Sequence, residues 1–184
     1  MQTEPPAITP SSHPYDALTP EVILDAIEAE GFEVNGRLFA LNSYENRVYQ
    51  VGIEDKPPVI AKFYRPDRWP DSAILEEHEF TLSLQEAGVP VVAPLVLPGG
   101  HSLGQYGDFR FAVFPQRGGQ APDTSVTDTL YRLGQWLGQI HNIGALKPFE
   151  HRPGFDLLAG LEQNNQVLVE GNWIPDDLKP AWNS

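Results

Sequence analysis

The chain has 184 residues, 41% of them hydrophobic, a formal net charge of −13 and no cysteine. This length predicts one domain, or one domain and part of another. The acidic balance argues against a nucleic-acid partner, and the lack of cysteine excludes disulfides and thiolate metal sites. No apolar segment approaches the roughly 18 residues that a membrane span needs. We therefore expect a cytoplasmic protein with no nucleic-acid or membrane partner.

The N-terminal region predicts a tail followed by a helix. Residues 1–16 are rich in Pro, Ser and Thr and are typical of a disordered tail, without the basic start or apolar core of a signal peptide. Thr19 then supplies an N-cap, and Pro20 suits the first helical position. The short amphipathic helix that follows is expected to end at Gly31.

Five runs of β-type residues come next, bounded by turn residues and prolines. They are Arg37–Leu41, Arg47–Gly52, Val59–Tyr64, Val91–Leu97 and Phe109–Phe114. A helix over 71–87, capped by Asp71 or Ser72 and stopped by Gly88, interrupts the series after the third run. A glycine-containing connection over 115–119 leads to an amphipathic helix over 127–143. This order matches the small lobe of the protein-kinase-like fold, its hinge and the first helix of the large lobe.

Lys62 is the only one of the four lysines that does not directly precede a proline, and it lies inside a strand run. Period-two alternation places it on the face of Ile60 and Tyr64. A half-buried ammonium is costly unless an anion pairs with it. Two anions fit, a nucleotide phosphate and a glutamate on the following helix. The alternative is an edge-strand lysine that blunts aggregation.

Several blocks of residues carry a specific resemblance. They are Leu41–Gln50, Lys62–Pro66, Arg68-Trp69, Ile74–His78 and Phe111–Pro115. The chain from about residue 19 to residue 180 resembles bacterial stress-response Ser/Thr protein kinases of the aminoglycoside-phosphotransferase-like superfamily. The resemblance implies an α+β fold: a kinase-like small lobe over 17–114 with a five-stranded antiparallel sheet and a helix, a hinge over 115–119, and an incomplete helical large lobe over 120–184.

The same resemblance implies ATP and Mg²⁺ as cofactors, a Ser/Thr hydroxyl of a protein as acceptor, and a monomer when full length. Ser43, in the first strand-to-strand turn, would contact the ATP phosphates, and Asn46 would brace that turn. The turn has no glycine, unlike its eukaryotic counterpart, and its residues alone also fit an ordinary hairpin.

Lys62 would neutralise the α- and β-phosphates, with a glutamate of the next helix as its partner. We choose Glu77 for that partner and keep Glu76 as the alternative. On their residues alone, both also fit a solvated acidic helix face. At the adenine, the resemblance implies stacking by Ile60 and contact with the hinge at Phe114, Pro115 and Gln116.

No His-x-Asp occurs in the 184 residues, so the His-Gly-Asp-x-x-x-x-Asn catalytic loop of this superfamily is missing. His151-Arg152-Pro153 lacks the acid of that loop, and Asp108-Phe109-Arg110 precedes the hinge. We therefore expect no catalytic residue and no Mg²⁺ ligand on this chain, and a fragment that is inactive alone. The helix over 127–143 would lack its packing partners and leave an apolar patch exposed.

The remaining histidines give no stronger signal. His141 is interpreted as a scaffold residue, and His78 and His101 have no supporting partner in the sequence.

Two other functions stay open: a small-molecule phosphotransferase of the same superfamily that acts on an aminoglycoside, sugar or amine, and a non-catalytic nucleotide-binding small lobe.

Overall fold

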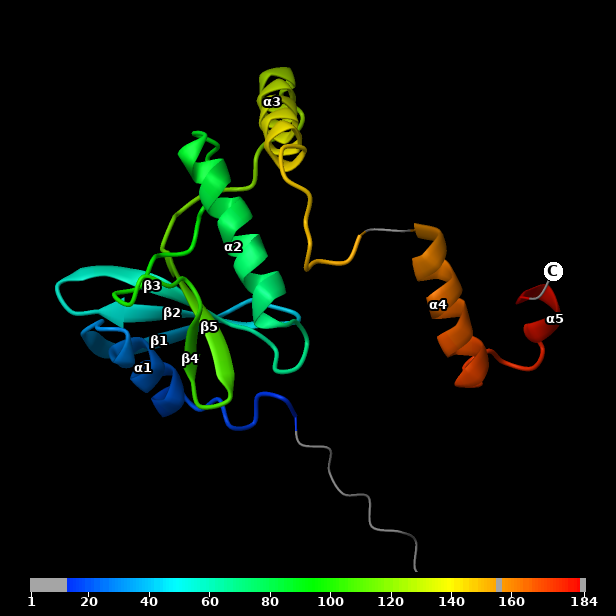
Figure 1. Cartoon of the computed structure of the whole chain (residues 1–184), viewed down its shortest axis with the longest axis horizontal. Helices are drawn as coiled ribbons and strands as arrows, with labels where there is room; N and C mark the ends of the chain where they lie inside the picture. The colour runs from blue at the N-terminus through cyan, green and yellow to red at the C-terminus, as the bar shows by residue number, and fades with distance from the viewer. Residues whose placement is uncertain (1–12, 155–156, 183–184) are drawn as a thin grey trace, which may run out of the picture. The chain divides into compact units, whose positions relative to one another are not determined.

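The computed structural model describes residues 13–154 and 157–182 (Figure 1). The chain divides between Pro148 and Phe149 into two compact units. The first unit contains α1 (Pro20–Ala29), β1 (Val34–Leu41), β2 (Arg47–Ile53), β3 (Lys56–Phe63), α2 (Asp71–Glu86), β4 (Gly104–Tyr106), β5 (Phe109–Pro115) and α3 (Thr127–Gly144). The second contains α4 (Leu157–Glu170) and α5 (Lys179–Trp182). In the parts described, no helix is long and apolar enough to cross a membrane.

The strands form one antiparallel sheet in the order β1-β2-β3-β5-β4. This arrangement confirms the predicted α+β fold with a five-stranded sheet and a helix inserted after the third strand. Because β3 lies between β2 and β5, Lys62 is on an inner strand. The edge-strand interpretation of Lys62 is therefore wrong.

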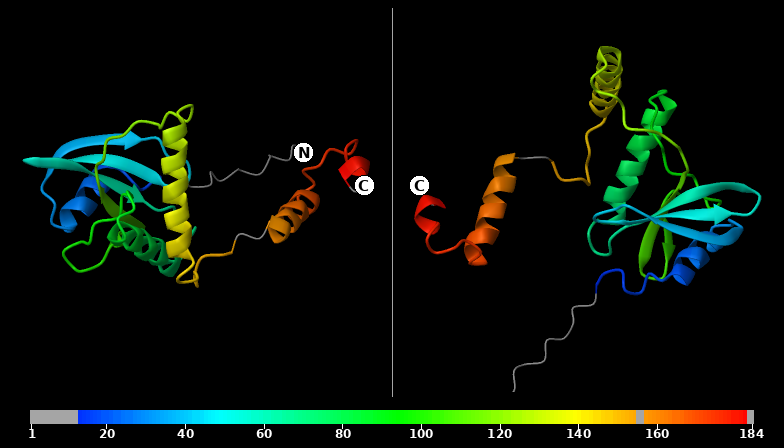
Figure 2. Two further views of the ribbon diagram at one scale, coloured as in Figure 1. Left: turned by 90° about the horizontal axis from the view of Figure 1, so that it is seen from above. Right: turned by 180° about the vertical axis from the view of Figure 1, so that it is seen from behind.

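The two faces of the sheet carry different packing, as the alternation along β3 predicts (Figure 2). Val59, Ala61 and Phe63 are buried together with residues of α1 in the main core. Phe63 stacks on Phe111 of β5, with 5.3 Å between ring centroids. On the other face, Tyr64 packs with Ile74 of α2. Lys62 therefore projects from the face that α2 covers.

Helix α1 begins and ends at the predicted signals. Thr19 accepts a hydrogen bond from the backbone N–H of Val22 at 3.4 Å, Pro20 is the first helical residue, and Gly31 follows with a φ of +83°. The N-terminus of α2 differs from the prediction. Its N-cap is Pro70, which makes no side-chain capping bond, and Asp71 is already helical. The Asp71 carboxylate instead accepts hydrogen bonds from Arg110 Nε at 2.9 and 3.0 Å.

The predicted strand over 91–97 is wrong, and the fourth strand is the short β4. Pro94 removes a backbone donor from the middle of this segment, and Pro90 and Pro98 remove the donors at its two ends, so it cannot form a continuous ladder. One backbone hydrogen bond joins this segment to β5, from Leu95 N to Val113 O at 2.7 Å. The apolar segment therefore packs beside β5 without becoming a strand of the sheet.

The predicted tail over 1–16 lies mostly outside the described residues, but its last four residues are placed in a turn. Tyr15 is buried in the main core, and its hydroxyl donates to the carbonyl of Glu45 at 2.9 Å. Burial raises the pKa of Tyr15 to about 12, against the opposing effect of the Arg47 charge. Tyr15 thus anchors the C-terminal end of the segment 1–16, which the composition predicts to be a tail.

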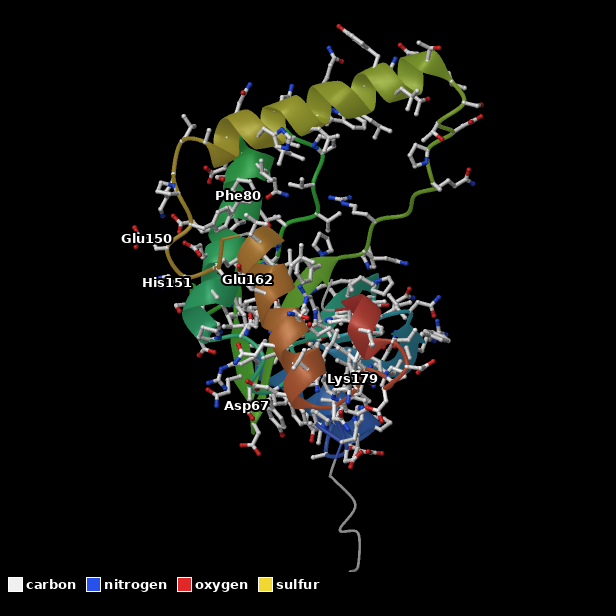
Figure 3. All side chains as sticks on the ribbon, turned by 90° about the vertical axis from the view of Figure 1, so that its right-hand side faces the viewer. Asp67, Phe80, Glu150, His151, Glu162 and Lys179 are labelled. Carbon is white, nitrogen blue, oxygen red and sulfur yellow. The ribbon has the colours of Figure 1, made fainter. Side chains whose placement is uncertain are left out.

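Helix α3 belongs to the first unit and contacts the C-terminal part of α2. Phe80 of α2 lies near Gly144, close to the end of α3 (Figure 3), and Lys147 Nζ lies 2.8 Å from Glu79 Oε1. No residue of α3 is buried. On its predicted apolar stripe, Leu130 is 50% exposed and Leu137 is 55% exposed.

Candidate functional site

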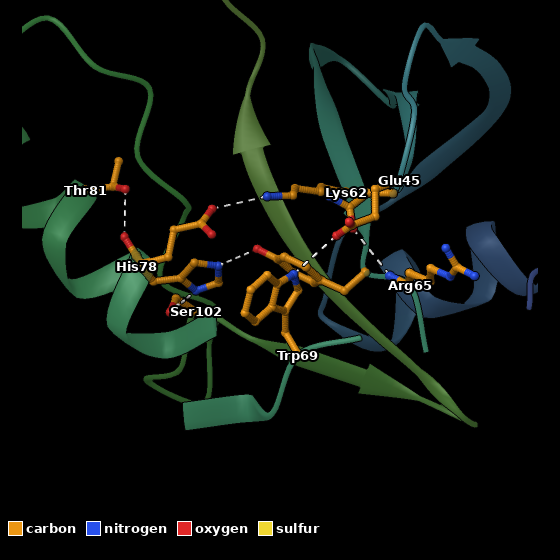
Figure 4. Close-up of polar contacts among 10 residues, drawn as sticks. Glu45, Lys62, Arg65, Trp69, His78, Thr81 and Ser102 are labelled. Carbon is orange, nitrogen blue, oxygen red and sulfur yellow. Dashed lines mark hydrogen bonds and ion pairs between the residues drawn. The ribbon is translucent and has the colours of Figure 1, made fainter. Parts of the chain in front are cut away.

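Lys62 and Glu77 form an ion pair between β3 and α2, with Nζ and Oε1 3.2 Å apart (Figure 4). The side chains are 23% and 33% exposed, so the pair is partly withdrawn from water but still open on one side. The Lys62 ammonium also lies 4.6 Å from the centroid of the Tyr64 ring, within the range of a cation–π contact. Between the two glutamates left open by the sequence, the geometry selects Glu77.

The register of the sheet places two of the other predicted nucleotide-binding residues, Ile60 and Phe114, beside this pair. Ile60 lies beside Phe114 on the neighbouring strand, two residues along β3 from Lys62. Because Ile60, Lys62 and Phe114 share one face, an apolar surface adjoins the ammonium. Pro115 ends β5, and the side chain of Gln116 donates to Gln50 Oε1 at 3.1 Å.

The β1–β2 turn is fastened to the segment that follows β3. Asn46 Oδ1 accepts from the backbone N–H of Arg65 at 3.3 Å, which is the bracing expected of this amide. Glu45 accepts from Arg68 Nε at 3.1 Å and from Trp69 Nε1 at 3.2 Å. Burial tends to raise the pKa of Glu45, but these hydrogen bonds and the nearby positive charges outweigh it and lower that pKa. The turn presents the exposed Ser43 from an anchored base.

A buried hydrogen-bonded chain lies beside the ion pair and was not predicted. Tyr64 Oη is 2.7 Å from His78 Nε2, and His78 Nδ1 is 2.8 Å from Ser102 Oγ (Figure 4). The expectation that His78 lacks a partner is therefore wrong. Its partners are 14 and 24 residues away in the sequence, a separation at which no spacing rule applies. The only available signal was a histidine directly after the glutamate chosen for Lys62.

His101 also has a partner, contrary to expectation, because its Nε2 lies 3.4 Å from a carboxylate oxygen of Glu30. This contact joins the end of α1 to the turn after residue 98 and is remote from Lys62 in sequence and in sheet position. His141 is exposed near the end of α3. Neither residue joins the cluster around Lys62.

A hollow of about 990 Å³ opens at the end of the sheet where the β3–α2 connection meets the β4–β5 turn. Its lining includes Arg65, Arg68 and Arg110. The last two guanidinium groups are already engaged, by Glu45 and by Asp71. The lining also contains several aspartates, so the hollow has no strong preference for an anion. Lys62 does not line it.

No group of three or more metal-ligating side chains is assembled within the described ranges 13–154 and 157–182. The expectation that the Mg²⁺ ligands lie outside this chain stays a prediction. The described residues provide the Lys62 ammonium on the sheet surface, an apolar strip of Ile60 and Phe114 next to it, and the anchored β1–β2 turn. These features suit the phosphates and the base of a nucleotide.

The fold and this site define a class. Residues 38–179 match the model of the phosphotransferase enzyme family, and the chain belongs to that family. Among curated relatives, stress response kinase A of Escherichia coli O157:H7 is 40% identical over 172 residues, which are 94% of this chain and 52% of that protein. A serine/threonine protein kinase RdoA of Salmonella typhimurium is also 40% identical, over 91% of this chain and 51% of that protein. The chain thus spans about half the length of these relatives.

Solved structures agree on the fold. Amicoumacin kinase hAmiN, in complex with AMP-PNP, Ca²⁺ and Ami, superposes with a TM-score of 0.63 at 18% identity, covering 82% of this chain and 50% of that one. A microcompartment-associated aminopropanol kinase gives a TM-score of 0.56 at 20% identity, covering 73% of this chain and 45% of that one. At these identities the likeness establishes the architecture only.

Proposed function

We propose that this chain binds ATP on the α2 face of its sheet and forms the nucleotide-binding half of a kinase. Lys62 would hold the α- and β-phosphates, and Ser43 would approach them from the β1–β2 turn. Ile60 and Phe114 would contact the adenine, with the backbone at Pro115 and Gln116 alongside. Bound Mg²⁺ would neutralise phosphate charge and would draw its ligands from outside this chain.

The observation that carries this proposal is the Lys62–Glu77 pair on the inner strand of the sheet, 3.2 Å apart and beside an apolar strip. A lone structural ion pair at this exposure would contribute little to stability. The Lys62–Glu77 pair would instead serve ligand binding, because Glu77 would hold the Lys62 ammonium in position for the ATP phosphates.

The acceptor is proposed to be a Ser or Thr hydroxyl of a protein substrate, because one 40%-identical relative is named a serine/threonine protein kinase. A small-molecule acceptor is the alternative. This chain contains no His-x-Asp, so we infer that its residues alone bind ATP without transferring the phosphoryl group. A cytoplasmic location and a monomeric state remain predictions.

The test is a titration of the chain with ATP and Mg²⁺, comparing wild type with Lys62→Ala. Losing a hydrogen-bonded charge of this kind costs about 1.5–3 kcal/mol, so the Kd should rise by about 10- to 100-fold. Lys56→Ala is the matched control, because Lys56 stands at the exposed start of the same strand. Equal Kd values for wild type and Lys62→Ala would contradict nucleotide binding at this site.

The phosphoryl-transfer inference has its own assay. The chain incubated with radiolabelled ATP and a general protein substrate should transfer no label above background. Label on the protein substrate would show that catalytic groups are present here and would overturn that inference, while leaving the binding site in place.

A further inference from the structure

We propose that His78 is a positioning residue, which holds α2 so that Glu77 meets Lys62. It does so through the hydrogen-bonded chain Tyr64–His78–Ser102. The proposal rests on the proposed nucleotide site and deepens it by naming what fixes the geometry of that site. The contacts that carry the proposal are those of His78 with Tyr64 and Ser102, next to the pair that Glu77 forms with Lys62.

His78 is the buried contact at the middle of α2. The helix buries Ala73 and Ile74 near its start and Leu84 near its end. Between these apolar anchors the buried residue is His78, which is 2% exposed. A buried imidazole needs its polar atoms satisfied. Both ring nitrogens are bonded, and because hydroxyl groups donate or accept, either tautomer of the ring fits.

Two cross-links lie side by side between α2 and the C-terminal end of β3, one from Lys62 within the strand and one from Tyr64 directly after it. Tyr64 follows Lys62 by two residues and shares its face of the sheet, and His78 directly follows Glu77 on α2. The Lys62–Glu77 link is partly open to water, where ion pairs are weak and their long side chains are costly to order. The Tyr64–His78 link is buried, and a short buried hydrogen bond constrains geometry more strongly.

Ser102 gives the chain its third attachment. It lies in the segment just before β4, so the histidine ties α2 to β3 through Tyr64 and to the β4 side through Ser102. A helix held at its centre from two directions resists rotation about its axis. Rotation is the movement that would carry the Glu77 carboxylate away from the Lys62 ammonium.

The experiment uses three variants that remove the links separately. Tyr64→Phe deletes only the hydroxyl. His78→Asn keeps an amide near the Nδ1 position and the Ser102 contact, whereas His78→Gln keeps one near Nε2 and the Tyr64 contact. Tyr106→Phe is the matched control, because it removes a hydroxyl on β4 that lies 3.5 Å from Asp25. Melting temperatures are recorded for all variants.

Two readouts separate positioning from folding. The first is the rate at which an acylating reagent modifies Lys62 without nucleotide, followed by mass spectrometry with Lys56 as internal reference. The second is the Kd for ATP. We expect Tyr64→Phe and His78→Asn to raise the Lys62 rate and the Kd by about 3- to 10-fold, the loss of one buried hydrogen bond. His78→Gln keeps the Tyr64 link and loses the Ser102 link, so its increase should be smaller than that of His78→Asn. Tyr106→Phe should stay within about twofold of wild type.

A double variant tests the route through Glu77. If His78 acts by placing that carboxylate, Tyr64→Phe added to Glu77→Gln should change the Kd less than Tyr64→Phe does alone. If these variants lower the melting temperature but leave the Lys62 acylation rate and the Kd for ATP unchanged, His78 has a purely structural role and the proposal is overturned. If wild type fails to bind ATP, the proposed function falls, whereas the acylation rates still decide whether His78 positions the pair.

Discussion

The inner strands β3 and β5 of the sheet and helix α3 all carry apolar residues at regular spacing, yet only the two strands bury them. Phe63, Phe111 and Val113 have no exposed surface. On α3, by contrast, Leu130 and Leu137 keep half or more of their side-chain surface in contact with water. The difference shows that periodicity reports which face of an element is suited to burial, and not whether a partner is present. Lys62, at the centre of the proposed nucleotide site, lies on one of these two inner strands.

The largest expected effect comes from breaking the packed region at its centre. Phe63→Ala removes a ring that contacts Tyr49, Phe109 and Phe111. Large-to-small substitutions of buried aromatic residues cost about 3–5 kcal/mol. We expect the urea unfolding midpoint to fall accordingly, with the intrinsic fluorescence as probe. A change below about 1 kcal/mol would mean that the core does not depend on this aromatic cluster.

Next in size is the effect of the charge partner on the proposed site. Glu77→Gln should weaken ATP binding by about 3- to 10-fold, because the Lys62 ammonium loses the carboxylate that places it. Glu79→Gln is the matched control on the same helix, since it breaks the exposed pair with Lys147. Equal losses in the two variants would indicate a general effect of negative charge on α2 instead of a specific partner for Lys62.

Burial of Tyr15 in the main core can be tested through pH. Burial raises the pKa of Tyr15 to about 12 from an ordinary value of 10, so the folded state favours the protonated phenol. Its contribution to stability is therefore fully present below pH 10 and is lost as the pH rises through about 12. The difference in absorbance at 295 nm between wild type and Tyr15→Phe should show a midpoint near 12. A midpoint near 10 would mean that this anchor is open to water.

The smallest effect is expected on α3. Leu137→Ala should change the free energy of unfolding by less than about 0.5 kcal/mol, because its side chain is already largely in water. The same urea experiment applies, with Leu130→Ala as a second position on the stripe, where the side chain is 50% exposed. A loss of about 2 kcal/mol or more would show that α3 is packed in solution and that the contrast with the sheet is false.

Local signals in the sequence predicted much of this structure. The cap at Thr19, the stops at Gly31 and Gly88, and the alternation along β3 each depend on neighbouring residues, and each is found. The selection of Lys62 rested on the same alternation. The sequence also limited the candidate partners of Lys62 to two adjacent glutamates, Glu76 and Glu77, whose side chains point about 100° apart around the helix axis. Only the packing of α2 distinguishes them.

The errors have two causes, which are local prolines that the strand prediction over 91–97 did not weigh and contacts between residues far apart in the chain. Residues 91–97 have strand-like composition, but the prolines and the position of β5 decide that only one ladder bond forms. His78 and Tyr15 gain their roles from partners 14 to 48 residues away. No local rule identifies such partners, and the positioning chain beside the site was missed for that reason.

ATP is proposed to bind between the β1–β2 turn and the α2 face of the sheet. Backbone hydrogen exchange with and without ATP and Mg²⁺ tests this proposal. Exchange should slow in the turn at 42–46, around Lys62 and at 114–116, with no such change in Lys62→Ala. Protection confined to 65–71 and 105–110, where the arginine-lined hollow lies, would contradict it. Unchanged exchange throughout the wild-type chain would contradict it as well.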